Sequence, residues 1–167
     1  MDFLRRLWRH LVTGHLRVRR DFPAVVLERI EAAIKDCESR HAGEIRFAVE
    51  PALAPAQVCR GLAARQRALE VFSHLRVWDT EHNNGVLVYL LLADRAVEIV
   101  ADRGAAGDRV APAEWQAVCR AMEQHFRDGE FEQGAVAGIR GVAAVLARHP
   151  PGRRGTGNEL PDKPVIL

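Results

Sequence analysis

The sequence predicts an α/β protein, built as a three-layer α/β/α sandwich around a small mixed β-sheet, with an N-terminal amphipathic helix and an extended C-terminal tail. Strand-like segments at 44–50, 85–93 and 96–102 are separated by segments with helical spacing, and the middle strand is apolar on both faces. The chain of 167 residues has 48% apolar and 28% charged residues, which suits one domain with a hydrophobic core.

Residues 1–20 form a basic amphipathic segment. They hold six arginines and one aspartate, which gives them a formal charge of +5, so the rest of the chain sums to −3 and the whole to +2. The apolar positions are Phe3, Leu4, Leu7, Trp8 and Leu11, opposite Arg5, Arg6 and Arg9. Two interpretations stay open: the helix docks on its own domain or a protein partner, or it lies on an anionic membrane surface.

The domain itself is expected over residues 21–149. Pro23 suits a first helical turn, and apolar residues recur with helical spacing until Gly43 ends the helix. The alternating segment GEIRFAVEP then predicts a strand near a sheet edge. Residues 56–76 return to helical spacing and predict one helix that crosses over to the next strand.

The centre of the sheet is predicted at 85–93. Asp94 and Arg95 supply the turn of a tight antiparallel hairpin with AVEIVAD. Helices follow at 112–129 and 131–148, and the second is rich in glycine and alanine, which allows close packing. Residues 150–167 form an extended tail of proline, glycine and charge, although its PVIL end is apolar for a free tail.

The cysteines and the absence of a leader indicate the compartment. Cys37, Cys59 and Cys119 are odd in number, have no metal-ligand spacing and fall on apolar helix stripes, as buried free thiols do. Arginines interrupt any signal-peptide core, and the longest uncharged run, 83–93, is too short to span a bilayer. We expect a cytoplasmic protein, with peripheral attachment to the inner membrane as the open alternative.

Polar residues gather at one end of the predicted sheet. A right-handed crossover makes the first two strands parallel, so their starts meet the end of the third strand. Carboxylate and amide oxygens suit a hard cation such as calcium or magnesium, whereas solvated turns and caps are the other interpretation of the same residues. The candidate metal ligands are Glu44, Asp79, Glu81, Asn83, Asp102 and Asp108.

Known catalytic motifs are missing from the sequence. It contains no GxSxG, HExxH, phosphate loop or dinucleotide fingerprint. His82, near Asp79, is the better candidate for acid–base work, and only Arg103 and Arg109 stand where a phosphate would need cations. No nucleophile is evident, and no basic patch is interleaved with aromatic residues, so nucleic-acid binding is not expected.

Four segments carry a resemblance to a known family. HAGEIRFAVE, VFSHLRVWDT, NNGVLVYLLLADRAVEIVADRG and AVAGIRGVAAVL together resemble the TPM-domain family, once called a domain of unknown function, over about residues 24–148. The tail GNELPDKPVIL resembles that of a proteobacterial branch. The resemblance implies an α/β/α sandwich, and it implies divalent metal at the acidic loops, where many members have aspartate at the position of Asn83.

The same resemblance sets the functional expectation. Family members include a thylakoid lumen protein credited with acid phosphatase activity and a receptor accessory protein. We expect a noncatalytic binding or accessory module that contacts a protein partner or a membrane surface through its N-terminal segment. A metal-dependent, acid phosphatase-like hydrolase is the alternative, with calcium or magnesium as the candidate cofactor and an unknown small-molecule ligand.

Overall fold

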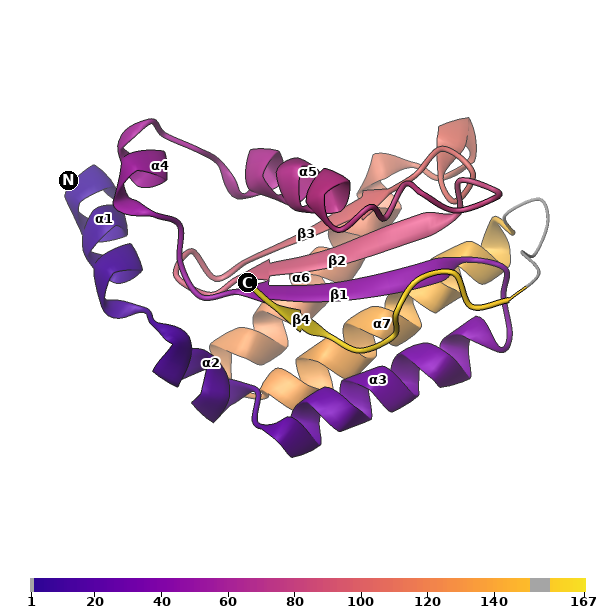
Figure 1. The fold of residues 1–167 in the computed structure, drawn as a ribbon, viewed down its shortest axis with the longest axis horizontal. Helices are drawn as coiled ribbons and strands as arrows, with labels where there is room; N and C mark the ends of the chain where they lie inside the picture. The colour runs from indigo at the N-terminus through magenta and orange to yellow at the C-terminus, as the bar shows by residue number, and fades with distance from the viewer. Residues whose placement is uncertain (1, 151–156) are drawn as a thin grey trace.

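The structure, a computed structural model, describes residues 2–150 and 157–167, without the side chains of Asp2 and Asp108. A four-stranded sheet in the order β3-β2-β1-β4 lies between two helical layers, which confirms the predicted α/β sandwich (Figure 1). The strands are β1 (Glu44–Glu50), β2 (Gly85–Leu91), β3 (Ala96–Ala101) and β4 (Val165–Ile166). The helices are α1 (Asp2–Val12), α2 (His15–Asp21), α3 (Ala24–Glu38), α4 (Pro55–Cys59), α5 (Ala64–His74), the 3-10 turn η1 (Gly107–Arg109), α6 (Pro112–Arg127) and α7 (Phe131–Arg148).

The sheet register places the predicted loops at one end. β1 and β2 are parallel, from Glu44 opposite Gly85 to Glu50 opposite Leu91. β3 returns antiparallel to β2. The starts of β1 and β2 and the end of β3 therefore share one end of the sheet, which we call the rim, while the β2–β3 turn lies at the opposite end.

The C-terminal tail corrects the predicted position of β1. The tail runs along β1, and β4 pairs with it in parallel at Ala48 and Val49 (Figure 1). β1 is thus interior to the sheet, and the prediction that it lies near an edge was wrong. The signal missed was the PVIL end, whose apolar residues belong to this strand.

Two helical segments also differ from the prediction. The helix expected over 56–76 is divided into α4 and α5, because Gly61 adopts a positive φ of 72°, which no helix interior contains. The additional helix α2 follows α1 and buries Val18 and, just beyond it, Phe22.

Each face of the sheet has its own core. α3, α6 and α7 cover one face, where Phe22 and Phe47 are buried, whereas α5 covers the other, where Leu87 and Tyr89 are fully buried. In α7, a Cβ at Gly138 would lie 2.1 Å from the sulfur of Met122 on α6, so the small residues do permit close helix packing.

The three thiols differ in exposure. Cys37 is buried and Cys119 is partly buried, as expected, but Cys59 is exposed because it ends the short helix α4 rather than lying inside a long one. Every helix within residues 2–150 and 157–167 is too short or too polar to cross a bilayer.

Candidate functional site

Two glycines let the rim loops pack backbone against backbone. A Cβ at Gly104 would lie 2.0 Å from the His82 carbonyl oxygen, and the Gly104 amide donates to the Asn83 carbonyl at 2.7 Å. A Cβ at Gly85 would lie 2.0 Å from the carbonyl oxygen of Val77. The structure thus brings together the loops that precede β2 and follow β3.

Glu44 binds the C-terminal tail. Its side chain is buried, and its Oε2 accepts hydrogen bonds from the amides of Glu159 and Leu160, both at 3.3 Å. Burial raises the pKa of Glu44, and the two amides act in the opposite direction. The carboxylate is therefore held by the tail.

Asp79 and Glu81 lie on the outside of the rim. Asp79 is exposed and 4.0 Å from Arg76, and the Glu81 carboxylate is exposed and 3.9 Å from His82. The amide of Glu81 donates to Glu159 at 2.7 Å, so the tail also fastens this loop. Within the described residues, no contact joins either carboxylate to Glu44.

Among the candidate metal ligands, Asp102 and Asn83 have the surroundings that best suit a ligand. Asn83 has a positive φ of 52°, and its Oδ1 accepts from Arg103 at 3.2 Å. Oδ1 of Asp102 accepts from the Arg103 amide at 2.7 Å, whereas Oδ2 is buried and has no hydrogen-bond partner in the described part of the chain. A buried carboxylate oxygen without a donor is uncommon and needs an explanation.

The described side chains form no group of three or more histidine, cysteine, aspartate or glutamate residues that could hold a metal ion. The side chain of Asp108 lies outside the described residues, and its backbone belongs to η1. The six-residue metal site therefore stays a prediction, and Asp102 provides the one buried carboxylate oxygen without a partner among the described candidates.

Both cations that a phosphate would need at the rim have other partners. Arg103 donates to Asn83, while Arg109 donates to the Gly104 carbonyl at 2.7 Å and to the Pro150 carbonyl at 2.8 Å. These arginines fasten loops to one another. Near this end of the sheet, the Ser39 hydroxyl donates to the Asp36 carbonyl at 2.7 Å, and the Thr80 hydroxyl accepts from the Asn84 amide at 3.0 Å.

A second acidic group, which sequence reasoning missed, holds the tail against β1. Glu38 at the end of α3 is buried, and it accepts from the Ile45 amide at 2.6 Å and shares a hydrogen bond with Asp162 of the tail. Burial, reinforced by the nearby carboxylates of Glu44 and Asp162, raises the pKa of Glu38 to about 8. The carboxyl group of Glu38 is therefore protonated at neutral pH.

Arg46 completes this attachment. It donates to the carbonyls of Pro161 and Lys163, the latter at 2.8 Å. Glu98 on β3 lies 3.6 Å from Arg65 on α5.

At the opposite end of the sheet, Asp94 anchors α1 to the domain. Arg6 contacts its carboxylate at 2.8 Å, and Nε2 of the buried His10 lies 3.1 Å from it. Nδ1 of His10 accepts from the Leu53 amide at 2.9 Å, so Nε2 carries the proton that Asp94 accepts. Burial alone would raise the pKa of Asp94, but the hydrogen bonds from Arg6 and His10 lower it.

This docking turns part of the apolar face of α1 outward. Leu7 packs against the core on the α5 side of the sheet. Leu4, Trp8 and Leu11 are 70%, 65% and 58% exposed, and we call these three residues the α1 stripe. The helix therefore docks on its own domain through Arg6, Leu7 and His10, and it leaves an apolar stripe that no described residue covers.

Comparison with known proteins identifies the family. The family model of the TPM domain matches residues 23–145, which is most of the chain. Among solved structures, the chain is similar to the NMR structure of BA42 protein from the psychrophilic bacterium Bizionia argentinensis, with 30% sequence identity and a TM-score of 0.73 over 86% of this chain and 94% of that one. No curated protein matches the sequence. The chain belongs to the TPM-domain family.

Proposed function

We propose that the protein is a noncatalytic module that binds the anionic surface of a membrane through the α1 stripe. The observation that carries the proposal is the exposure of Leu4, Trp8 and Leu11 on a helix that is anchored from its other side. Because Asp94 holds the helix through Arg6 and His10, the stripe is exposed while α1 stays docked on the domain.

The two N-terminal helices, one of which carries the stripe, are rich in arginine. The side chains of Arg5 and Arg19 are exposed and have no hydrogen bond or ion pair with any described residue, and Arg9 is half-exposed with a long 3.4 Å contact to Asp94. Each basic residue near an anionic surface contributes about 1 kcal/mol, and each inserted apolar side chain up to about 2 kcal/mol. The electrostatic and apolar contributions together give a larger binding free energy than the marginal one expected for a short helix that binds by apolar insertion alone.

The rim supports the noncatalytic part of the proposal. Arg103 and Arg109 bind loop atoms, and Glu44 binds tail amides, so the described polar groups there perform structural work. The hydrolase alternative gains no observation of its own. Absence of turnover on phosphomonoesters with magnesium, manganese or calcium, at acid and neutral pH, is the result we expect.

Co-sedimentation with vesicles tests the membrane proposal. The wild-type protein should bind phosphatidylglycerol vesicles at low salt, bind less as salt rises, and ignore phosphatidylcholine vesicles. Leu4→Ser and Trp8→Ser should remove the binding while the melting temperature stays unchanged. Leu69→Ser and Trp78→Ser are matched controls, because these residues are 47% and 49% exposed but lie elsewhere.

The outcomes separate the interpretations. If the stripe variants bind vesicles as well as the controls do, the membrane proposal is wrong and the stripe is left for a protein partner. Point substitutions are sharper than deletion of residues 1–20, since that deletion would also remove the fully buried Val18.

A divalent cation at the rim is the second candidate, and the partner-free Oδ2 of Asp102 favours it. A cation would satisfy this buried oxygen together with loop carbonyls. Millimolar calcium should then raise the melting temperature of the wild-type protein, and Asp102→Asn should abolish the rise. The exposed Asp79→Asn is the control, and an equal rise in all three proteins would exclude Asp102 as a ligand.

A further inference from the structure

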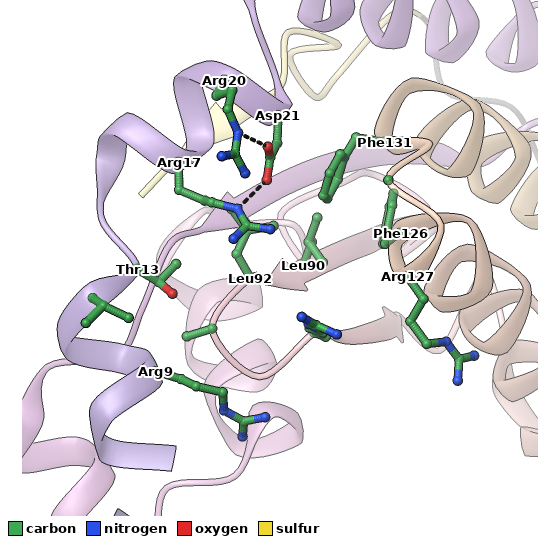
Figure 2. A pocket seen from close by; sticks show the side chains of 14 residues that line it. Arg9, Thr13, Arg17, Arg20, Asp21, Leu90, Leu92, Phe126, Arg127 and Phe131 are labelled. Carbon is green, nitrogen blue, oxygen red and sulfur yellow. Dashed lines mark hydrogen bonds and ion pairs between the residues drawn. The ribbon is translucent and has the colours of Figure 1, made fainter. Parts of the chain in front are cut away.

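A cavity of about 520 Å³ lies at the end of the sheet opposite the rim. Three separate segments form it: the α1–α2 elbow around Thr13, the end of β2 with the following turn, and the connection between α6 and α7 at Gly129 (Figure 2). Its volume falls within the range of sites for small ligands, about 300–1,000 Å³. The metal candidates of the rim are not among its lining residues.

Five arginines line the cavity with a single carboxylate. Arg9, Arg17, Arg20, Arg95 and Arg127 face one acidic residue, Asp21, which leaves an excess of four positive charges. A cleft with charge of one sign concentrates counter-ions of the other sign. The cavity therefore selects for an anion.

Asp21 orients two of these arginines through their Nε atoms and leaves their terminal guanidinium nitrogens available to a ligand. Its carboxylate is buried and accepts from Nε of Arg17 at 2.7 Å and from Nε of Arg20 at 2.9 Å, and Figure 2 shows both side chains converging on it. The terminal nitrogens of both guanidinium groups have no partner among the described residues. Two preoriented forks are thus available.

The opposite wall adds two more free guanidinium groups. Arg127 uses only Nε, which donates to the Glu123 carbonyl at 3.3 Å. Arg95 is exposed in the β2–β3 turn with a positive φ of 53°, and no described residue forms a hydrogen bond or ion pair with its side chain. Neither side chain is needed to hold the fold together.

The cavity also has an apolar side. Leu92 and Phe131, which are partly exposed, and Val12, which is 58% exposed, are among its lining residues, and Phe131 is stacked on the buried Phe126 with ring centroids 5.6 Å apart (Figure 2). A bare inorganic ion would leave this surface uncovered. The ligand should therefore carry an apolar body next to its charged group.

We propose that this cavity, which we call the arginine pocket, binds a phosphate monoester attached to an apolar group. Guanidinium forks match the oxygens of phosphate in pairs, and a phosphate monoester carries nearly two negative charges at neutral pH, which suits an excess of four positive charges better than a carboxylate does. The same chemistry occurs in a soluble alkyl phosphate and in the head group of phosphatidic acid.

Titration calorimetry with hexyl phosphate tests the soluble source. The full-length protein should bind it, and Arg95→Gln and Arg127→Gln should each weaken binding about tenfold, the loss expected for one charged hydrogen-bond pair. Arg60→Gln and Arg120→Gln are matched controls, because both are exposed, lie outside the pocket and change the net charge equally. Hexanoate should bind at least tenfold more weakly than hexyl phosphate, by the same reasoning about charge.

Vesicles test the lipid source. Phosphatidic acid vesicles should be preferred to phosphatidylglycerol vesicles of equal surface charge, and the preference should vanish in Arg95→Gln and Arg127→Gln but persist in Trp8→Ser. Because Leu4 and Trp8 do not line the pocket, this preference and the stripe's binding can fail separately.

The results decide the proposal as follows. Loss of hexyl phosphate binding in the pocket variants alone supports a soluble ligand, and loss of the phosphatidic acid preference alone supports the lipid. No binding to either, equal weakening in the control variants, or equal affinity for hexanoate would overturn the proposal.

Discussion

Replacement of Glu38 by glutamine should make the stability of the protein much less dependent on pH. The carboxyl group of Glu38 is buried, protonated at neutral pH and hydrogen-bonded to Asp162 and to the Ile45 amide. Glutamine keeps both interactions, because its amide nitrogen donates to Asp162 as the protonated acid does and its oxygen still accepts from Ile45.

The size of the effect follows from the two pKa values. The pKa is 4.5 in the unfolded chain and about 8 in the folded protein. A raised folded-state pKa gives stability that is fully present below pH 4.5 and is lost as the pH rises to 8. The loss is about 1.4 kcal/mol per pH unit, so on the order of 4 kcal/mol between pH 5 and pH 8. The raised pKa of Glu44 acts in the same direction.

Thermal unfolding of the wild-type protein, Glu38→Gln and Glu28→Gln between pH 5 and pH 9 measures this. We expect the melting temperature of the wild type to fall by roughly 10 °C relative to Glu38→Gln across that range, at about 2–4 °C per kcal/mol. Glu28 lies exposed on the same helix and serves as the control. Parallel pH profiles for all three proteins would refute the assignment of a protonated Glu38.

Three further substitutions test the tail, the rim and the N-terminal helix. Leu160→Ala should cost about 2–4 kcal/mol in denaturant unfolding because Leu160 is buried in the core, whereas Ile166→Ala, at a 39% exposed position of the same tail, should cost much less. Gly104→Ala should destabilise the protein by roughly 1–3 kcal/mol or more because its Cβ would overlap the His82 carbonyl, while Gly14→Ala, which meets no atom within 4 Å, should be neutral by chemical denaturation. Asp94→Ala should release α1, so limited proteolysis should cleave the first 20 residues faster than in Asp79→Ala, and equal rates would contradict the anchoring role of Asp94.

The sheet could be predicted from local patterns because its central strands carry them. Residues 44–50 alternate and residues 85–91 are apolar throughout, so both segments predict strands, although the alternation did not predict the burial of Glu44 and Glu50. The break at Gly61 was not predictable from apolar spacing, since the spacing continues through it and only the backbone conformation changes. β4 pairs through two residues, and its position depends on contacts with β1 that are more than 100 residues away in sequence.

At the candidate sites, too, local sequence patterns predict one part and tertiary packing decides the rest. The rim could be predicted, because strand ends and the handedness of the crossover bring its loops together. The roles of its residues could not be predicted, since Glu44 and Arg46 contact a tail whose path is set by tertiary packing. The arginine pocket had no sequence signal at all. Its arginines come from three distant segments and become neighbours only after α2 packs on the side of the sheet that α3, α6 and α7 cover.

The tail has a consequence for how the sheet ends. β4 has only two residues, and Pro161 and Pro164 in the tail just before it have no amide hydrogen to donate, so this edge offers a short template for another strand. At the other edge, Arg65 binds the Ile99 carbonyl and Glu123 binds the Val97 amide, which occupies outward backbone groups of β3. Both borders of the sheet therefore resist intermolecular strand pairing, which protects the protein from aggregation and directs any protein partner to helical surfaces rather than to β-augmentation.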